Sequence, residues 1–435
     1  MKATHGPAFR IPFQGLSRHG WVNLAIAGLL VFYSAQVALD ISWNNFCGHL
    51  GIDYCAFWSA GEVANTDGYA AVYDLKNLEA VQQRAFPRDV RAQGTTATIP
   101  TPYLPVFLLP FGLLSPLGPE WGYVLWTAAN FAVLAWYIRF FVSRYTGSPV
   151  EKRVWILLLA SFPVFLNFFY GQVNTWLTIF VGEYMRAAAA GKPYRAGMWL
   201  SGLLIKPQYL VLIGIALVMR RAGRTLVGLA LMSALLLGAS YAMIGGPGFS
   251  ALLQLWLGFA GGLPATGPNV MMNWRAVGLF LDGLTKPTVL WPLIVIAMLL
   301  TALAGLAPWR RAIAPASPYF ATALLGTLAA TSAFVWHSHT YSAMILLCPL
   351  LLLRQSPRRL PEKAVELWVL VPPAFQLAAT VLSGLNRAGV LTGFSPDSVY
   401  FVSAVAPFGF NLYFVIWALQ HSRQVDSLNP VLPAP

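Results

Sequence analysis

The chain has 435 residues, of which 57% are hydrophobic and only 10% are charged. Soluble globular domains carry about a quarter charged residues, so these figures exclude a soluble globule of this size, and they also exclude disordered, collagen-like and disulfide-rich classes. Basic residues exceed acidic ones by 13. No basic loop interleaved with aromatic residues lies outside the apolar runs, so a nucleic-acid partner is not expected.

Apolar runs follow one another along almost the whole chain. A membrane-spanning helix needs about 20 apolar residues, and twelve runs are expected to span: 21–41, 120–141, 154–170, 172–190, 195–206, 208–220, 224–244, 289–307, 318–336, 341–354, 365–385 and 398–420. The stretch 103–117 contains three prolines, which remove backbone donors, so we expect it to be re-entrant or juxtamembrane. The predicted fold class is therefore an all-α polytopic membrane protein with about 12 transmembrane helices.

Basic residues cluster after alternate spans of this count. The clusters are Arg18, Arg139–Arg153, Arg186–Arg195, Arg220–Arg224, Arg310–Arg311, Arg354–Lys363 and Arg423. The positive-inside rule then places both termini in the cytoplasm. The basic N-terminal segment has no cleavage site, so we expect a retained first helix.

The same topology puts two long loops on the outer side. These are the acidic first outer loop, 42–102, and a second outer loop, 245–288. We expect one integral membrane domain over 1–423, followed by a disordered tail, 424–435. Cys47 and Cys55 lie in the first outer loop, where they could pair in an oxidising compartment or stay free.

Lys206 lies where two short runs, 195–206 and 208–220, meet at Pro207. A helix break with a lysine at membrane depth is tolerated where it lines a cavity, and such residues are functional candidates. Lys206 could neutralise a phosphate there. The alternative is a lysine that snorkels from a helix end to the membrane surface.

Asp53 follows the first span and is flanked by Tyr54 and Trp58. Partial loss of hydration raises the pKa of a carboxylate, which suits a general base. The alternative is an ordinary solvated acid of the loop.

Three other outer segments carry candidate ligands. His337 and His339 could donate hydrogen bonds or charge to a phosphate; a metal site is less favoured because no Cys, Asp or Glu cluster accompanies them, and an aromatic belt at the interface is the alternative. Gln172 and Asn174 could contact sugar hydroxyls, although Asn174 could equally cap a helix. Arg275 could bind phosphate in bidentate geometry or belong to a plain surface loop.

Five motifs stand in order between residues 45 and 355. They are Asp53-Tyr54 through to Tyr73-Asp74, Tyr103-Leu104-Pro105, Gly171 to Asn174, Gly197 and Gly202 leading to Lys206-Pro207, and His337 to Tyr341. This order resembles the membrane-embedded GT-C glycosyltransferases of family 87, the domain of unknown function 2029 group. That family includes polyprenol-phosphate-mannose-dependent mannosyltransferases. Leu104 replaces the first proline of the family's Tyr-Pro-Pro element.

The resemblance implies a GT-C-like fold and a role for each motif. Asp53 would be the catalytic base, with Lys206 and either His337 or His339 near the lipid phosphate; the sequence does not choose between the two histidines. Tyr54, Trp58 and Tyr103 would contact substrate.

The resemblance implies an inverting transfer of a monosaccharide from a polyprenyl-phosphate donor to a lipid or glycan acceptor at the outer face of a bacterial inner membrane. A donor without pyrophosphate weakens the need for a divalent metal, so neither a metal nor another cofactor is expected. A transporter or lipid flippase is the alternative, because broken helices with buried charges also mark transporters.

Overall fold

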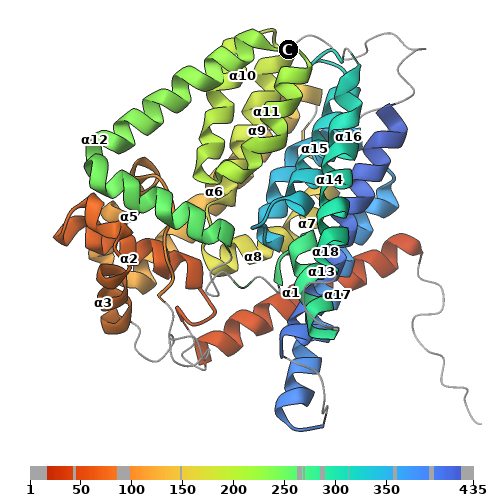
Figure 1. Cartoon of the computed structure of the whole chain (residues 1–435). Coiled ribbons are helices and arrows are strands. Elements are labelled where there is room, and N and C mark those ends of the chain that lie inside the picture. The colour runs from red at the N-terminus through yellow and green to blue at the C-terminus, as the bar shows by residue number, and fades with distance from the viewer. Residues whose placement is uncertain are drawn as a thin grey trace, which may run out of the picture.

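The computed structural model describes residues 17–42, 46–85, 98–146, 149–261, 267, 270–284, 290–311, 313–355, 360–390 and 396–422. Within these ranges the chain is helical with no β-strand, apart from two isolated bridges (Figure 1). The all-α class is thereby confirmed. The expected tail 424–435 and parts of both long outer loops lie outside the described residues.

The helices follow the chain in this order. The first part contains α1 (Arg18–Ser42), α2 (Ile52–Thr66), η1 (Tyr69–Tyr73), α3 (Leu75–Ala85), α5 (Pro105–Leu114), η2 (Ser115–Leu117), α6 (Gly118–Thr146), α7 (Lys152–Ala160), α8 (Phe162–Tyr170) and α9 (Asn174–Ala189). The second part contains α10 (Pro193–Leu200), η3 (Ser201–Ile205), η4 (Pro207–Tyr209), α11 (Leu210–Met219), α12 (Gly223–Gly261), α13 (Trp274–Leu284), α14 (Trp291–Leu306), η7 (Ala307–Arg310), α15 (Pro318–Phe334), η8 (Thr340–Leu346), α16 (Leu347–Gln355), α17 (Glu362–Arg387) and α18 (Pro396–His421).

Each apolar run expected to span coincides with a helix or a helix pair. In the described part of the chain, six helices are long and apolar enough to cross a membrane, or seven if α7 and α8 form one span. Those two helices are bent by 56° at Ser161, which has extended backbone angles. The molecule is thus a polytopic membrane protein, while twelve spans remain a prediction.

The two outer loops contain helices that the hydropathy pattern did not predict. The first loop forms α2, η1 and α3, and the second holds α13 and the last part of α12. α12 is kinked at Gly245, whose φ of 63° and ψ of −176° are accessible essentially only to glycine. After the kink, α12 turns back across the molecule above α2 and α5 (Figure 1).

Glycines allow the helices around the cavity to pack closely. A Cβ atom on Gly197 of α10 would lie 1.9 Å from the carbonyl oxygen of Thr225 on α12, and one on Gly228 would lie 2.1 Å from that of Tyr194. A glycine also allows α2 and α5 to pack closely, since a Cβ on Gly61 would lie 2.3 Å from a carbonyl oxygen of α5. These contacts fix the helices that lead to the site.

Ion pairs join the basic ends of four helices. Arg18 at the start of α1 and Arg153 near the start of α7 both contact Glu366 of α17, the first at 2.6 Å. Arg354 near the end of α16 lies 3.7 Å from Glu362 at the start of α17. Three of the basic clusters expected on one side of the membrane are therefore neighbours in space.

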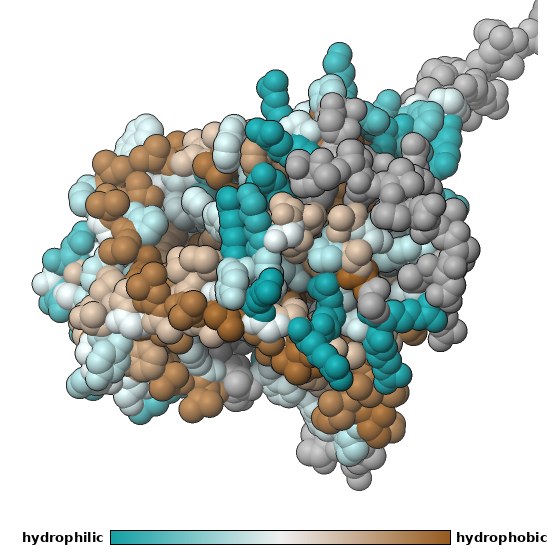
Figure 2. All heavy atoms as spheres, turned by 90° about the horizontal axis from the view of Figure 1, so that it is seen from above, coloured by the Kyte–Doolittle hydropathy of each residue, from teal (hydrophilic) through white to brown (hydrophobic). Residues whose placement is uncertain are grey.

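The α9–α10 and α11–α12 turns lie at the upper end of the molecule in Figure 1. They contain Lys192, Arg220 and Arg221. Seen from this end, hydrophilic side chains gather across the middle of the face, beside a hydrophobic region (Figure 2). Basic residues thus lie at one end of the molecule, away from the site described next.

Candidate active site

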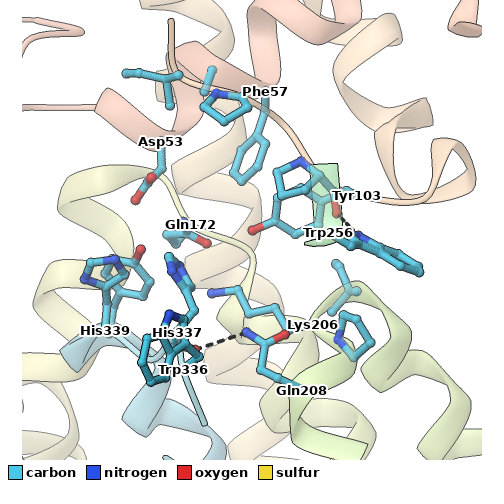
Figure 3. Close-up of a pocket in the computed structure, with 17 residues that line it drawn as sticks. Asp53, Phe57, Tyr103, Gln172, Lys206, Gln208, Trp256, Trp336, His337 and His339 are labelled. Atoms are coloured by element: carbon cyan, nitrogen blue, oxygen red, sulfur yellow. Dashed lines mark hydrogen bonds between the residues drawn. The ribbon is translucent and has the colours of Figure 1, made fainter. Parts of the chain in front are cut away.

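A cavity of about 280 Å³ opens where the polar corners of the sequence meet (Figure 3). It is lined by Asp53, Ala56, Phe57, Ile99, Pro100, Pro102, Tyr103, Gln172, Ile205, Lys206, Pro207, Gln208, Trp256, Trp336, His337, His339 and Tyr341. Its volume is near the lower end of small-molecule pockets and suits a single sugar ring. Residues separated by up to 288 positions thus share one site.

Asp53 lies in the first turn of α2, where the helix dipole favours a carboxylate. The helix begins after Gly51, which has a φ of 72° and donates its N–H to the carbonyl of Phe169 at 2.8 Å. Burial raises the pKa of Asp53 to about 6, while a hydrogen bond from Gln172 and the charge of Lys206 act in the opposite direction. Asp53 is thus poised to accept a proton near neutral pH.

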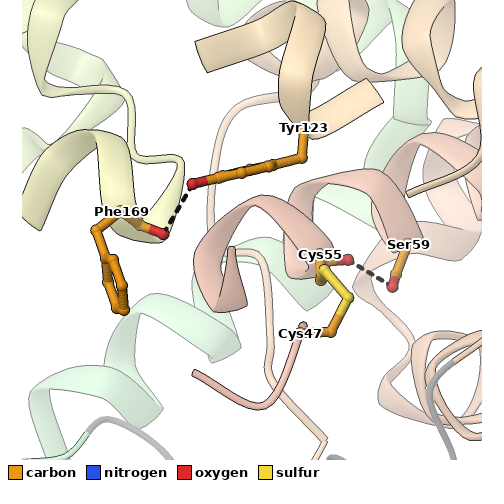
Figure 4. The surroundings of a disulfide bond; sticks show 5 residues. All are labelled: Cys47, Cys55, Ser59, Tyr123 and Phe169. Atoms are coloured by element: carbon orange, nitrogen blue, oxygen red, sulfur yellow. Dashed lines mark hydrogen bonds between the residues drawn. A yellow bond between two sulfur atoms is a disulfide. The ribbon is translucent and has the colours of Figure 1, made fainter. Parts of the chain in front are cut away.

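A disulfide between Cys47 and Cys55 holds the start of α2 (Figure 4). The sequence allowed these two cysteines to be paired or free, and in the structure they are paired. On the neighbouring segment, the hydroxyl of Tyr123 donates to the carbonyls of Phe168 and Phe169 at 2.9 and 3.2 Å. The turn that carries Asp53 is therefore fixed covalently on one side, and the segment it packs against is fixed by hydrogen bonds.

Lys206 occupies the corner between η3 and η4, and only 7% of its surface is exposed. Its ammonium donates to Oδ1 of Asn174 at 2.9 Å and to the hydroxyl of Ser342 at 3.4 Å. The same ammonium lies 4.8 Å from the ring centroid of Tyr341, in a cation–π contact. All three contacts suit a charged ammonium, and Lys206 lines the same cavity as Asp53.

Asn174 is fully buried and does not line the cavity. Its side-chain amide donates to Oδ1 of Asn167 at 3.0 Å, so its own Oδ1 is turned toward Lys206. The residue expected to contact sugar lies behind the lysine and orients it. Gln172, from the same corner, does line the cavity and hydrogen-bonds with Asp53 and Tyr103.

His337 and His339 both line the cavity, with their ring centroids 4.9 Å apart. Burial is the main reason that the pKa of His337 lies well below its usual value, and nearby His339, Lys206 and Arg275 add to the effect. A neutral imidazole can donate one hydrogen bond without a charge. The structure places both rings in the cavity and leaves the choice between them open.

Arg275 lies outside the lining. Its guanidinium is 4.9 Å from the ring centroid of Trp336, and it donates to the carbonyl of Trp336 at 3.4 Å. Trp336 itself lines the cavity. Arg275 therefore supports the cavity wall and adds positive potential from behind it.

Two further residues expected to contact substrate are part of the core. Tyr54 is fully buried, and the indole of Trp58 donates to the carbonyl of Ser115 at 3.0 Å. Their large side chains hold α2 against α5, η2 and α6. Neither lines the cavity.

Eleven lining residues were not assigned to the site from the sequence. Four of these carry large polar or aromatic side chains and lie near the lysine, the histidines or α12: Gln208, Trp256, Trp336 and Tyr341. Gln208, Trp336 and Tyr341 lie in or next to the Lys-Pro and His-rich motifs, so their positions in the sequence could have identified them. Trp256 lies on the part of α12 that follows the kink at Gly245, and no sequence motif pointed to it. Among the described residues, no three His, Cys, Asp or Glu side chains form a group that could hold a metal ion.

Comparison with known sequences assigns the chain to a protein family. The sequence model of glycosyltransferase family 87 matches residues 101–335, which is more than half of the chain and includes Tyr103, Gln172 and Lys206. Comparison with curated proteins and with solved structures gives no match. The family assignment favours an enzyme over the transporter alternative. The chain belongs to glycosyltransferase family 87, and it is a multi-pass membrane glycosyltransferase.

Proposed function

We propose that this enzyme transfers a monosaccharide, with inversion, from a polyprenyl-phosphate donor to a lipid or glycan acceptor at the outer face of the membrane. One observation carries the proposal: the carboxylate of Asp53 and the ammonium of Lys206 line the same sugar-sized cavity. A base and a phosphate-binding cation are the two groups that a single displacement at an anomeric carbon requires.

Asp53 removes the proton from the attacking hydroxyl of the acceptor. Its raised pKa makes the carboxylate more basic, and Gln172 holds it in place. The acceptor oxygen forms a bond to the anomeric carbon on the face opposite the phosphate. The proton remains on Asp53 until water carries it away.

Lys206 stabilises the departing group. As the bond between the anomeric carbon and the phosphate oxygen breaks, the electron pair stays on that oxygen, and the sugar passes through an oxocarbenium-like state. Because Lys206 is already oriented by Asn174, little reorganisation is needed when the negative charge develops. A hydrogen bond from His337 or His339 would add to this stabilisation.

The charges of the cavity support a monophosphate-linked donor. A sugar phosphodiester of a polyprenol has one negative charge, and the lining formed by the described residues contains one lysine and no arginine. Arg275 contributes from behind Trp336. Phosphate binding by protein side chains alone is consistent with a leaving group that needs no metal.

Two observations support the outer location of the cavity. The basic turns at Lys192 and Arg220 lie at the other end of the molecule, where the positive-inside rule puts the cytoplasm. The disulfide between Cys47 and Cys55 holds the start of α2, the helix that carries Asp53, and disulfides persist in oxidising compartments. The inner membrane of a bacterium, with both termini inside, fits this arrangement.

The test is transfer of label from polyprenyl-phosphate mannose to native acceptors in membrane vesicles of a deletion strain that expresses each variant. Asp53→Asn keeps the shape but removes the base, and we expect turnover to fall by about 10² to 10⁴-fold. Asp67→Asn, an exposed acid of the same loop, should be neutral. Wild-type turnover in Asp53→Asn would remove the base assignment, and no transfer by the wild type would refute this sugar donor.

A further inference from the structure

The cavity has a polar side and an apolar side. Asp53 lies on one side and Trp256 on the other, with Tyr103 and Lys206 between them (Figure 3). The apolar side chains of the lining are Ala56, Phe57, Ile99, Pro100, Pro102, Ile205, Pro207 and Trp256. Among these side chains only the indole of Trp256 could offer a sugar a hydrogen bond, so most of this wall suits an apolar group better than sugar hydroxyls.

That indole N–H is already used. Trp256 donates it to the carbonyl of Pro102 at 2.7 Å, so the ring is held as a fixed apolar plate against the 98–104 segment. The helix behind it is also fixed, since a Cβ on Gly248 would lie 2.9 Å from Ile244 and 3.3 Å from Ala70. Trp256 is therefore a preformed part of the cavity wall.

Apolar surface continues from Trp256 to the outside of the molecule. Leu253 lies one turn before Trp256 on α12 and Leu257 lies one turn after Leu253, and these two leucines are 41% and 73% exposed. α5, which packs against α12, exposes Leu109 and Leu113 at 45% and 82%. A chain that leaves the cavity past Trp256 would thus pass from one apolar surface to the next.

We infer that the apolar side of the cavity binds the isoprenoid chain of the donor, with Trp256 as the residue that recognises its first units. The inference rests on the proposed function, because it takes the donor phosphate to lie at Lys206. Asp53 and the acceptor occupy the polar side, so the chain has to leave on the side of Trp256. Burial of its methyl and methylene groups against the indole provides the affinity.

Two donors separate this inference from the proposed function. One is polyprenyl-phosphate mannose, and the other is mannose linked to ethyl phosphate, which reacts at the same centre but has no isoprene unit. We expect Trp256→Ala to lower kcat/KM for the polyprenyl donor by at least about tenfold, mainly through KM, and to leave the ethyl donor nearly unaffected. Trp121→Ala, which removes a 73% exposed tryptophan of α6, should change neither.

The outcomes are distinct. An equal loss with both donors, or no loss with either, would overturn the role of Trp256; absence of transfer by the wild type would instead count against the proposed function. If Trp256→Ala does not fold, photo-crosslinking of wild-type protein with a diazirine-bearing polyprenyl phosphate provides the second measurement. Crosslinks within 247–258 or 99–103 would support the inference, and crosslinks confined to other helices would refute it.

Discussion

At the scale of single residues, the cavity combines opposite charges in a partly dry space. Burial works against the ionised form of Asp53, whereas Lys206 and the amide of Gln172 favour it. The balance leaves the pKa of the carboxyl at about 6. A carboxyl with this pKa is ionised at neutral pH and is still a stronger base than an ordinary solvated acid.

The activity should therefore depend on pH in a defined direction. Because the base must be deprotonated, kcat/KM for the acceptor should fall as the pH is lowered through about 6, reaching about one-tenth of its plateau one unit below. The proposed donor is a phosphodiester, which does not titrate in this range. The measurement is initial transfer rate between pH 5 and 8 in the vesicle assay.

Gln172 offers the matched variant for this profile. Gln172→Leu removes a hydrogen bond that lowers the pKa of Asp53, so the acidic limb should move to higher pH. A role of Gln172 in sugar binding alone would change KM and leave the limb where it was. A flat profile over this range in the wild type would argue that another group limits the reaction.

At the scale of helices, small residues determine where the cavity residues lie. α10 runs past α12 with Gly197 against the backbone of Thr225, then continues through η3 to Lys206. Gly202 lies against the ring of Phe180, where a Cβ would be 2.5 Å from the ring carbons. The glycines that precede the Lys-Pro motif thus set the position of the lysine.

Enlarging one of these glycines should displace the corner. Gly197→Ala would force α10 away from α12, so we expect a loss of about 1 to 3 kcal/mol in stability and a lower transfer rate. Gly214→Ala on α11 is the control, because no atom lies within 4 Å of the added methyl group. Thermal unfolding in detergent gives the comparison, and equal midpoints for the two variants would contradict the packing argument.

The sequence predicted the helices and the polar corners well because both follow from local patterns. Long apolar runs identify helices, and a charged residue at a helix break, such as Lys206, marks a cavity. The sequence did not predict the contacts between segments that are distant along the chain. Asn174 and Arg275 are polar and were read as ligands, but tertiary packing puts Asn174 behind Lys206 and Arg275 behind Trp336. Trp256 was missed because the glycines and the proline at 245–248 mark a break, but the sequence does not show the direction in which α12 continues after it.

At the scale of the whole molecule, the basic turns and the cavity lie at opposite ends of the helices that connect them. The ends of α1, α7, α16 and α17 meet through arginine–glutamate pairs. The corners that form the cavity are at the opposite ends of α9, α10 and α15 from the basic turns. Such a separation lets the membrane fix the orientation of the enzyme through its basic end, independently of the residues that bind substrate.

This orientation can be tested with the cysteines of the chain. Cys47 and Cys55 are joined in a disulfide and Cys348 is buried, so the wild type provides an unreactive background. A membrane-impermeant maleimide applied to intact spheroplasts should label Lys76→Cys, on exposed α3 near the cavity end. It should label Lys192→Cys, in the exposed α9–α10 turn, only after permeabilisation. The reverse pattern would place the candidate active site in the cytoplasm. Because sugar-nucleotide donors are made there, it would also count against a lipid-linked donor.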